Sequence, residues 1–152
     1  MLEKLALVAL ANVLPTLEQV AAIPLGIALG LPLEYVTLVS LIANPLIFFP
    51  VYFALEFFYE SVLSRIKRFN DYLLKVREKG KPYVDKYGMV GIALFVVLPT
   101  PFTGTYTATV LSWLLGLEIK KSFAAIVLGS ALRTVSISLA AGGTLTLLSA
   151  IF

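Results

Sequence analysis

Two ionisable side chains stand within apolar sequence, and they are the residues best placed to do chemistry. Glu18 lies between the apolar runs 5–17 and 20–33, and Arg133 interrupts the apolar run that begins at residue 122. At the centre of a bilayer each charge costs about 2.5 to 3.5 kcal/mol on insertion scales, so such residues are rare and usually paired or functional. We expect Glu18 and Arg133 to meet in the interior of a membrane protein.

The pair has two interpretations. In the first it is a switchable site, in which Arg133 holds an anionic group while Glu18 competes for Arg133 or carries a proton. In the second it is a buried salt bridge that fixes two halves of the protein and transports nothing.

A second candidate segment is an apolar stretch broken in its middle by Pro99, Pro101 and Gly104. Threonine hydroxyls at 100, 103, 105, 107 and 109 can bond the backbone groups that such a break leaves free. The flanking arms, 89–98 and 105–117, hold ten and thirteen residues, whereas a bilayer core needs roughly 20. The pattern predicts a re-entrant hairpin that dips to mid-membrane and returns; one long, kinked spanning helix is the alternative.

The residues around Glu18 repeat this form and predict a first hairpin with Glu18 at or near its tip, a single spanning helix being the alternative. In each hairpin a returning helix would start at depth, near residues 21–24 with Pro24 in its first turn, and near Thr103 or Thr105 as N-cap. Both helix N-termini would aim free amides at the centre. Together with Arg133 they favour an anion such as phosphate or carboxylate.

Two other segments are long enough to cross a membrane. The run 35–58 contains prolines that predict a kink near its middle, and a second span covers 122 to about 141, with the glycines at 142–143 as a possible break. Asn44 and Ser130 within these spans are candidates for interhelical hydrogen bonds or for the site.

The segment between the spans is basic. Residues 61–79 have the apolar spacing of one helical face, and Gly80 and Pro82 are expected to end that helix. The range 61–88 holds eight of the twelve Lys and Arg residues. The positive-inside rule therefore places this segment in the cytoplasm, with the amphipathic helix in the interface near anionic lipid.

The chain thus contains two repeats, each with a predicted hairpin followed by a predicted span. We predict an all-α integral membrane protein of the cell membrane with a single domain, in which residues 1–60 form the first repeat, 61–88 the cytoplasmic amphipathic linker and 89–152 the second repeat. Because the first span ends at the cytoplasmic linker, the two hairpins open to opposite sides. Inverted repeats of this kind are the architecture of many secondary transporters.

Composition supports this class and excludes others. Hydrophobic residues make up 59% of the 152 residues and charged residues 14%, well below the roughly 25% of soluble domains. Cysteine and histidine are absent, which excludes a disulfide framework, thiolate zinc sites and a histidine base. The net charge of +3 resides in the basic linker, so we expect no nucleic-acid partner. We also expect no enzymatic activity, no metal and no cofactor.

Two segments resemble signatures of the putative small multidrug export protein family. In the stretch EQVAAIPLGIALG the matching residues are Glu18, Ala22, Ile23, Pro24, Leu25, Gly26, Ile27, Ala28, Leu29 and Gly30. In the stretch LPTPFTGTYTATVLSWLLGL they are Pro99, Pro101, Thr103, Gly104, Gly116 and Leu117. The family often has arginine two residues after the glutamate, where this chain has Val20 and Ala21.

The family is similar to the wider DedA or VTT superfamily, whose members resemble lipid scramblases and undecaprenyl-phosphate flippases with two opposed re-entrant hairpins. The resemblance implies a membrane transporter for a substrate such as a lipid phosphate. Arg133 then stands for the buried arginine of the DedA relatives.

Three functions follow from these observations. The first is a proton-coupled transporter or flippase for an anionic amphiphile, with Glu18 and Arg133 as its binding pair and the residues Pro24, Pro99, Pro101, Thr103, Gly104 and Thr105 as its walls. The second is a small multidrug exporter in which Glu18 alternates between a proton and a cation. The third is a membrane scaffold. Membrane lipids, a small amphiphilic substrate and a second copy in a homodimer or larger homo-oligomer are the expected partners.

Overall fold

The computed structural model describes residues 1–15, 17–98 and 104–151, and every regular element in these ranges is a helix. The helices, in chain order, are α1 (Leu2–Val13), α2 (Glu18–Ala28), α3 (Leu33–Leu46), α4 (Phe48–Ser61), the 3-10 turn η1 (Leu63–Arg65), α5 (Lys67–Val97), α6 (Thr105–Leu114) and α7 (Ile119–Ile151). Two segments, Leu33–Arg65 and Ile119–Thr144, are long and apolar enough to cross a membrane.

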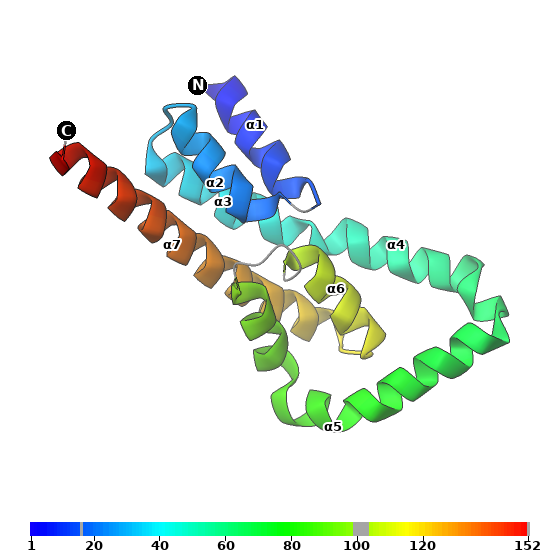
Figure 1. Ribbon diagram of the computed structural model, residues 1–152. Coiled ribbons are helices and arrows are strands. Elements are labelled where there is room, and N and C mark those ends of the chain that lie inside the picture. The colour runs from blue at the N-terminus through cyan, green and yellow to red at the C-terminus, as the bar shows by residue number, and fades with distance from the viewer. Residues whose placement is uncertain (16, 99–103, 152) are drawn as a thin grey trace.

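Helices α3 and α4 form one bent rod, as Figure 1 shows. The bend falls at Ile47, between Pro45 and Pro50, where the missing proline donors interrupt the ladder of helical hydrogen bonds. The kink predicted near the middle of 35–58 is therefore confirmed.

Helix α5 does not end where the sequence predicted. It begins at Lys67, after η1, and continues through Gly80 and Pro82. A proline inside a helix removes one hydrogen-bond donor, and α5 remains helical at Pro82 without that bond. The sharp bend comes at Gly88, whose φ of 27° lies in the left-handed region that glycine tolerates.

The apolar face of α5 is covered by protein over part of its length. Phe69 meets the ring of Tyr59 on α4, and Leu73 is buried. Part of the face that the sequence assigned to the membrane interface thus packs on the molecule itself.

Helix α7 is unbroken through Gly142 and Gly143, so the predicted break there is wrong. At Gly142 a β-carbon would lie 2.9 Å from Leu33 Cδ2. The missing side chain therefore lets α3 approach α7 closely, while the helical hydrogen bonds of α7 continue.

Two apolar clusters lie along α7, one on each side of residues 130–134. The first joins Phe48, Ile92, Val96, Ala108, Leu117, Ala125 and Ile126. The second joins Val8, Ala11, Ala22, Ile23, Leu31 and Val36, with Ile137 and Ala141 packed against it. A band of buried polar side chains separates them at residues 130–134 of α7.

Two helix pairs approach this band from opposite ends of α7 (Figure 1). In the first pair, α1 and α2, Gln19 in the first turn of α2 contacts Ser130 of α7. Leu33, which follows the loop after α2, lies at Gly142. In the second pair, the part of α5 after Gly88 and α6, the first turn of α6 lies at the same band, and Leu117 beyond α6 joins the cluster around Ala125. Tyr106 of α6 donates a hydrogen bond to the carbonyl of Val13 at the end of α1. The two pairs therefore touch at the band.

Candidate functional site

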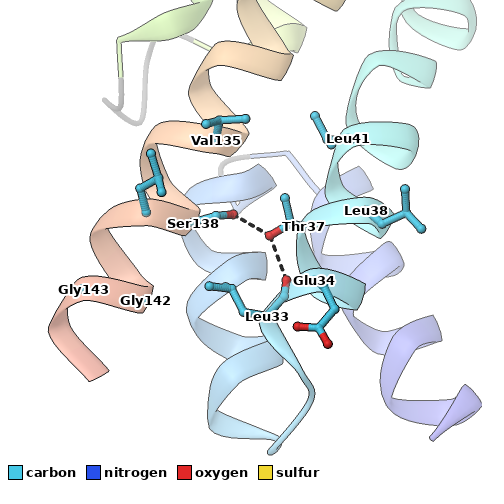
Figure 2. A pocket seen from close by; sticks show the side chains of 10 residues that line it. Leu33, Glu34, Thr37, Leu38, Leu41, Val135, Ser138, Gly142 and Gly143 are labelled. Carbon is cyan, nitrogen blue, oxygen red and sulfur yellow. Dashed lines mark hydrogen bonds between the residues drawn. The ribbon is translucent and has the colours of Figure 1, made fainter. Parts of the chain in front are cut away.

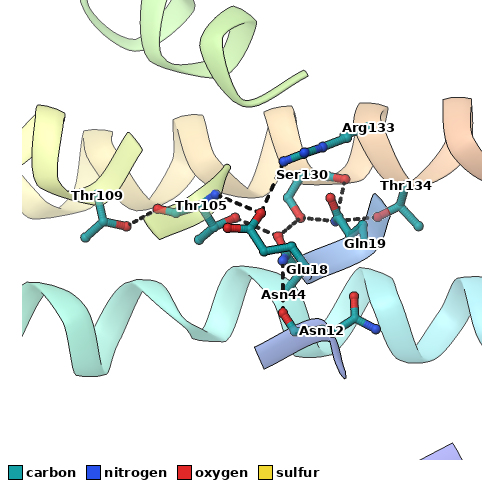
Figure 3. Close-up of polar contacts among 9 residues, drawn as sticks. All are labelled: Asn12, Glu18, Gln19, Asn44, Thr105, Thr109, Ser130, Arg133 and Thr134. Carbon is teal, nitrogen blue, oxygen red and sulfur yellow. Dashed lines mark hydrogen bonds and ion pairs between the residues drawn. The ribbon is translucent and has the colours of Figure 1, made fainter. Parts of the chain in front are cut away.

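A buried ion pair occupies the polar band. Arg133 Nη1 lies 3.1 Å from Glu18 Oε2, and the two residues are 2% and 6% exposed. Figure 3 shows the carboxylate between α7 and the first turn of α6, where the amide of Thr105 donates to the same Oε2 at 3.3 Å. The N-terminus of α6 thus directs an amide and the positive end of its dipole at the carboxylate. The expected meeting of Glu18 and Arg133 is confirmed.

The backbone around the carboxylate is closely fitted. Gly104 packs directly on Glu18, because a β-carbon at position 104 would overlap both carboxylate oxygens. Glu18 itself has a φ of 41°, an unusual conformation for a residue with a side chain, and it begins α2 there. Strained backbone of this kind clusters at functional sites.

Asn44 of α3 ties the elements around the ion pair together. Its Oδ1 accepts hydrogen bonds from Thr105 Oγ1 at 2.6 Å and from Ser130 Oγ at 3.0 Å. Its Nδ2 donates to the carbonyl of Asn12 at 3.4 Å. One amide therefore joins α1, α3, α6 and α7 beside the ion pair.

Gln19 makes the corresponding contacts on α7. Its Nε2 lies 2.7 Å from Ser130 Oγ and 2.6 Å from Thr134 Oγ1. Its Oε1 is buried and has no partner among the residues that the structure describes. A buried acceptor of this kind is costly unless a water or another polar group satisfies it.

The polar stripe on α7 continues from Ser130 and Thr134 to Ser138, at helical spacing. Ser138 Oγ accepts from Thr37 Oγ1 at 2.8 Å, and both residues line a groove of about 570 Å³ between α3 and α7. Figure 2 shows this groove, whose other walls are mostly apolar side chains, together with Glu34 and the backbone of Gly142 and Gly143. A line of hydroxyls therefore leads from the ion pair toward the groove.

The structure brings together four of the predicted site residues, Glu18, Arg133, Gly104 and Thr105. Pro24 does not join them. It is exposed in the middle of α2, which begins at Glu18 rather than near residues 21–24. The predicted helix start at Pro24 is therefore wrong. Pro99, Pro101 and Thr103 lie outside the described residues.

Asn44 and Ser130, candidates from the sequence, lie at the site. Sequence reasoning missed Asn12, Gln19 and Thr134, all fully buried. Gln19 directly follows Glu18, and Thr134 repeats the polar residue at 130 after four positions, so both had a local signal. No group of three or more possible metal ligands occurs in the described part of the chain.

The fold and the site define a class, that of all-helical proteins with candidate membrane spans and a buried ion pair where their helices converge. The chain belongs to the family described as putative small multi-drug export protein, whose model matches residues 18–135. The matched range starts at Glu18 and includes Arg133, so both members of the ion pair belong to the family region. The comparisons with curated proteins and with solved structures found no match.

Proposed function

We propose that this protein is a proton-coupled membrane transporter or flippase for an anionic amphiphile such as a lipid phosphate. The observation that supports this proposal is the buried contact between Arg133 and Glu18. The carboxylate of Glu18 also accepts a hydrogen bond from the amide of Thr105. A guanidinium and a helix N-terminus form a set of donors suited to a phosphate or carboxylate, and in the present state Glu18 supplies that carboxylate.

The proposed membrane arrangement uses two spans and two re-entrant hairpins in an inverted repeat. Helices α1, α2 and α6 have 12, 11 and 10 residues, which is about 15 to 18 Å of helix and too short to cross. The two helix pairs approach the polar band from opposite ends of α7, as two hairpins from opposite leaflets would. Non-helical backbone at that depth is tolerated only where protein or a water-filled cavity surrounds it, and the first residues after the two turns, Glu18 and Thr105, are buried.

The mechanism is an exchange of partners at Arg133. An entering anion replaces the carboxylate of Glu18 on the guanidinium and on the amide of Thr105. The displaced carboxylate would then be a buried charge without a partner, which is costly, so it binds a proton. One anion and one proton therefore move together, and release of both restores the ion pair.

A flux assay in proteoliposomes tests this proposal. Transport of a fluorescent lipid phosphate should fall to the protein-free background in Glu18→Gln and in Arg133→Ala, because each variant removes one side of the exchange. Glu60→Gln is the matched control, since Glu60 is an exposed glutamate outside both the ion pair and the groove. If both site variants transport as fast as the control, the assignment is wrong.

Coupling needs a separate readout. A pH-sensitive dye inside the vesicles should report proton movement with the anion, at about one proton per substrate, and an imposed proton gradient should drive accumulation. Accumulation that ignores the gradient would contradict the proton coupling while leaving the anion site intact.

The family description favours a second function, the export of cationic drugs. In that case Glu18 would bind a proton and a cation in turn, and Arg133 would only repel the substrate. The charge of the substrate distinguishes the two functions. If a lipophilic cation is transported and a lipid phosphate is not, the exporter replaces the first proposal.

A further inference from the structure

A cavity and an apolar slot meet where α5 bends, far along the chain from the ion pair. The cavity, of about 390 Å³, is lined by Asp85, Lys86 and Lys121 among others. The slot, of about 180 Å³, lies between α6 and the part of α5 after Gly88. Tyr87, Gly88 and Leu117 line both spaces, so the two are adjacent.

The residues that line the cavity carry two positive charges and one negative charge. Lys86 and Lys121 line it against one acidic residue, Asp85. Lys121 Nζ lies 3.3 Å from Glu118, but both side chains are largely exposed, and exposed ion pairs of this kind are weak. Lys121 can therefore exchange Glu118 for a phosphate. Lys86 Nζ lies 5.0 Å from the ring of Tyr87, a residue shared by cavity and slot.

The slot is suited to hydrocarbon. Its walls include Ile92, Phe95 and Leu111, and it is open because Gly91 has no side chain. A β-carbon at 91 would meet only the β-carbon of Tyr87, at 3.4 Å, so the space beside Gly91 is accessible. Removing an acyl chain from water into such a slot is favourable in proportion to the apolar area covered.

We propose that this space binds one anionic phospholipid, with its phosphate on Lys86 and Lys121 and the first part of one acyl chain in the slot. Neither the two lysines nor the apolar slot alone would select an anionic phospholipid. A free phosphate would leave the slot empty, and a zwitterionic headgroup would add a cation to a cavity that is already positive. The site is distinct from the Glu18–Arg133 pair, and the inference does not depend on transport.

Native mass spectrometry of the detergent-purified protein tests the site with three probes: phosphatidylglycerol, phosphatidylcholine with the same chains, and glycerol phosphate without chains. Phosphatidylglycerol should bind about tenfold or more tightly than phosphatidylcholine, because both lipids offer a phosphate but the choline cation is repelled by the two lysines. Glycerol phosphate should neither bind at the same concentration nor displace the lipid.

Variants separate the headgroup from the chain. Lys86→Gln with Lys121→Gln should lose about tenfold in affinity for phosphatidylglycerol, whereas Lys67→Gln with Lys75→Gln, two exposed lysines outside the cavity, should not. Gly91→Leu should fill the slot and weaken binding, with Gly143→Leu as its control because position 143 has open space.

Several results would overturn the proposal. Equal binding of the two lipids, or equal loss in both lysine pairs, would show that the cavity does not recognise the anion. Competition by glycerol phosphate would indicate a headgroup-only site. The lysine variants alter exposed side chains, so an unchanged helical circular dichroism spectrum is expected and makes their result decisive even if Gly91→Leu fails to fold.

Discussion

At the scale of single residues, Gly104 and Glu18 depend on each other. The carboxylate occupies the space in which any side chain at 104 would lie, and the same carboxylate holds the first amide of α6 and the guanidinium of Arg133. The glycine is therefore required for room rather than for backbone conformation, because its φ of −124° suits any residue.

Gly104→Ala should displace the carboxylate from Arg133. We expect a loss of flux and a destabilisation of about 1 to 3 kcal/mol, the usual cost of overpacking a closed site. Flux in proteoliposomes and the midpoint of thermal unfolding in detergent measure the two effects. Gly143→Ala, at a helical position with no neighbour within 4 Å, should change neither.

Removing one charge of the ion pair should cost more than removing both. Arg133→Met leaves a buried carboxylate unpaired, which is expected to reduce the free energy of unfolding by about 3 to 5 kcal/mol, and adding Glu18→Gln should restore most of it. Reversible unfolding in mixed detergent measures each variant. A scaffold shows no flux even in the wild-type protein, whereas a transporter is active as the wild type and stable but inactive with both substitutions, so the flux of the wild type compared with that of the double variant separates the two.

At the scale of elements, α6 is held at both ends. Thr105 at its start contacts Glu18, while Arg77 of α5 donates to the carbonyls of Trp113 and Leu114 at its end, both at 3.3 Å. The indole of Trp113 donates to Glu56 of α4 at 2.8 Å. A helix of 10 residues thus connects the basic helix α5 directly to the ion pair.

Arg77→Gln should loosen the far end of α6. It removes the charged donor from the carbonyls of the last turn, which should cost about 1 to 2 kcal/mol. Hydrogen exchange should become faster in the last turn of α6 and in the facing turn of α5. Lys75→Gln, an exposed neighbour on the same helix, should leave exchange unchanged, and equal exchange in both variants would contradict the role of Arg77.

The sequence predicted the presence of the helices better than the residues at which they end. The polar residues Glu18 and Arg133 and the kink near Pro45 followed from the cost of charge and of missing donors in apolar helices. The ends expected at Gly80, Pro82 and residues 142–143 did not occur, because a helix with hydrogen bonds on both sides tolerates one weak position. Whether glycine bends or continues a helix depends on its packing, as the contrast between Gly88 and Gly142 shows.

The site was predictable only where it involved charge. Gln19 and Thr134 are polar residues in helices, and their sequence positions alone do not distinguish a buried partner from a solvated one. Their role depends on α2 lying across α7, a contact between residues more than 100 positions apart.

At the scale of the whole molecule, a polar band divides two apolar clusters along α7. If the protein lies in the membrane as proposed, this band is at the middle of the bilayer. The many exposed large apolar side chains of the described helices would then face lipid or a second copy. The expected homo-oligomer stays a prediction.

Cysteine labelling measures this depth directly, because the chain has no cysteine of its own. Single cysteines at positions 18 and 133 should react slowly with a membrane-impermeant maleimide, whereas cysteines at the exposed positions 67 and 79 should react rapidly and from one side only. Rapid labelling of 18 and 133 from bulk water would contradict the midplane position.

The continuity of α7 limits how the protein can move. Because this one unbroken helix contributes to both apolar clusters, the two halves cannot rock against each other as independent rigid bodies unless α7 bends. Alternating exposure of Arg133 would instead come from displacement of the short helices α2 and α6 along a stationary rod. In the proposed transporter the moving parts would then be a few turns of backbone, and access to the two sides would change without a domain-sized rearrangement.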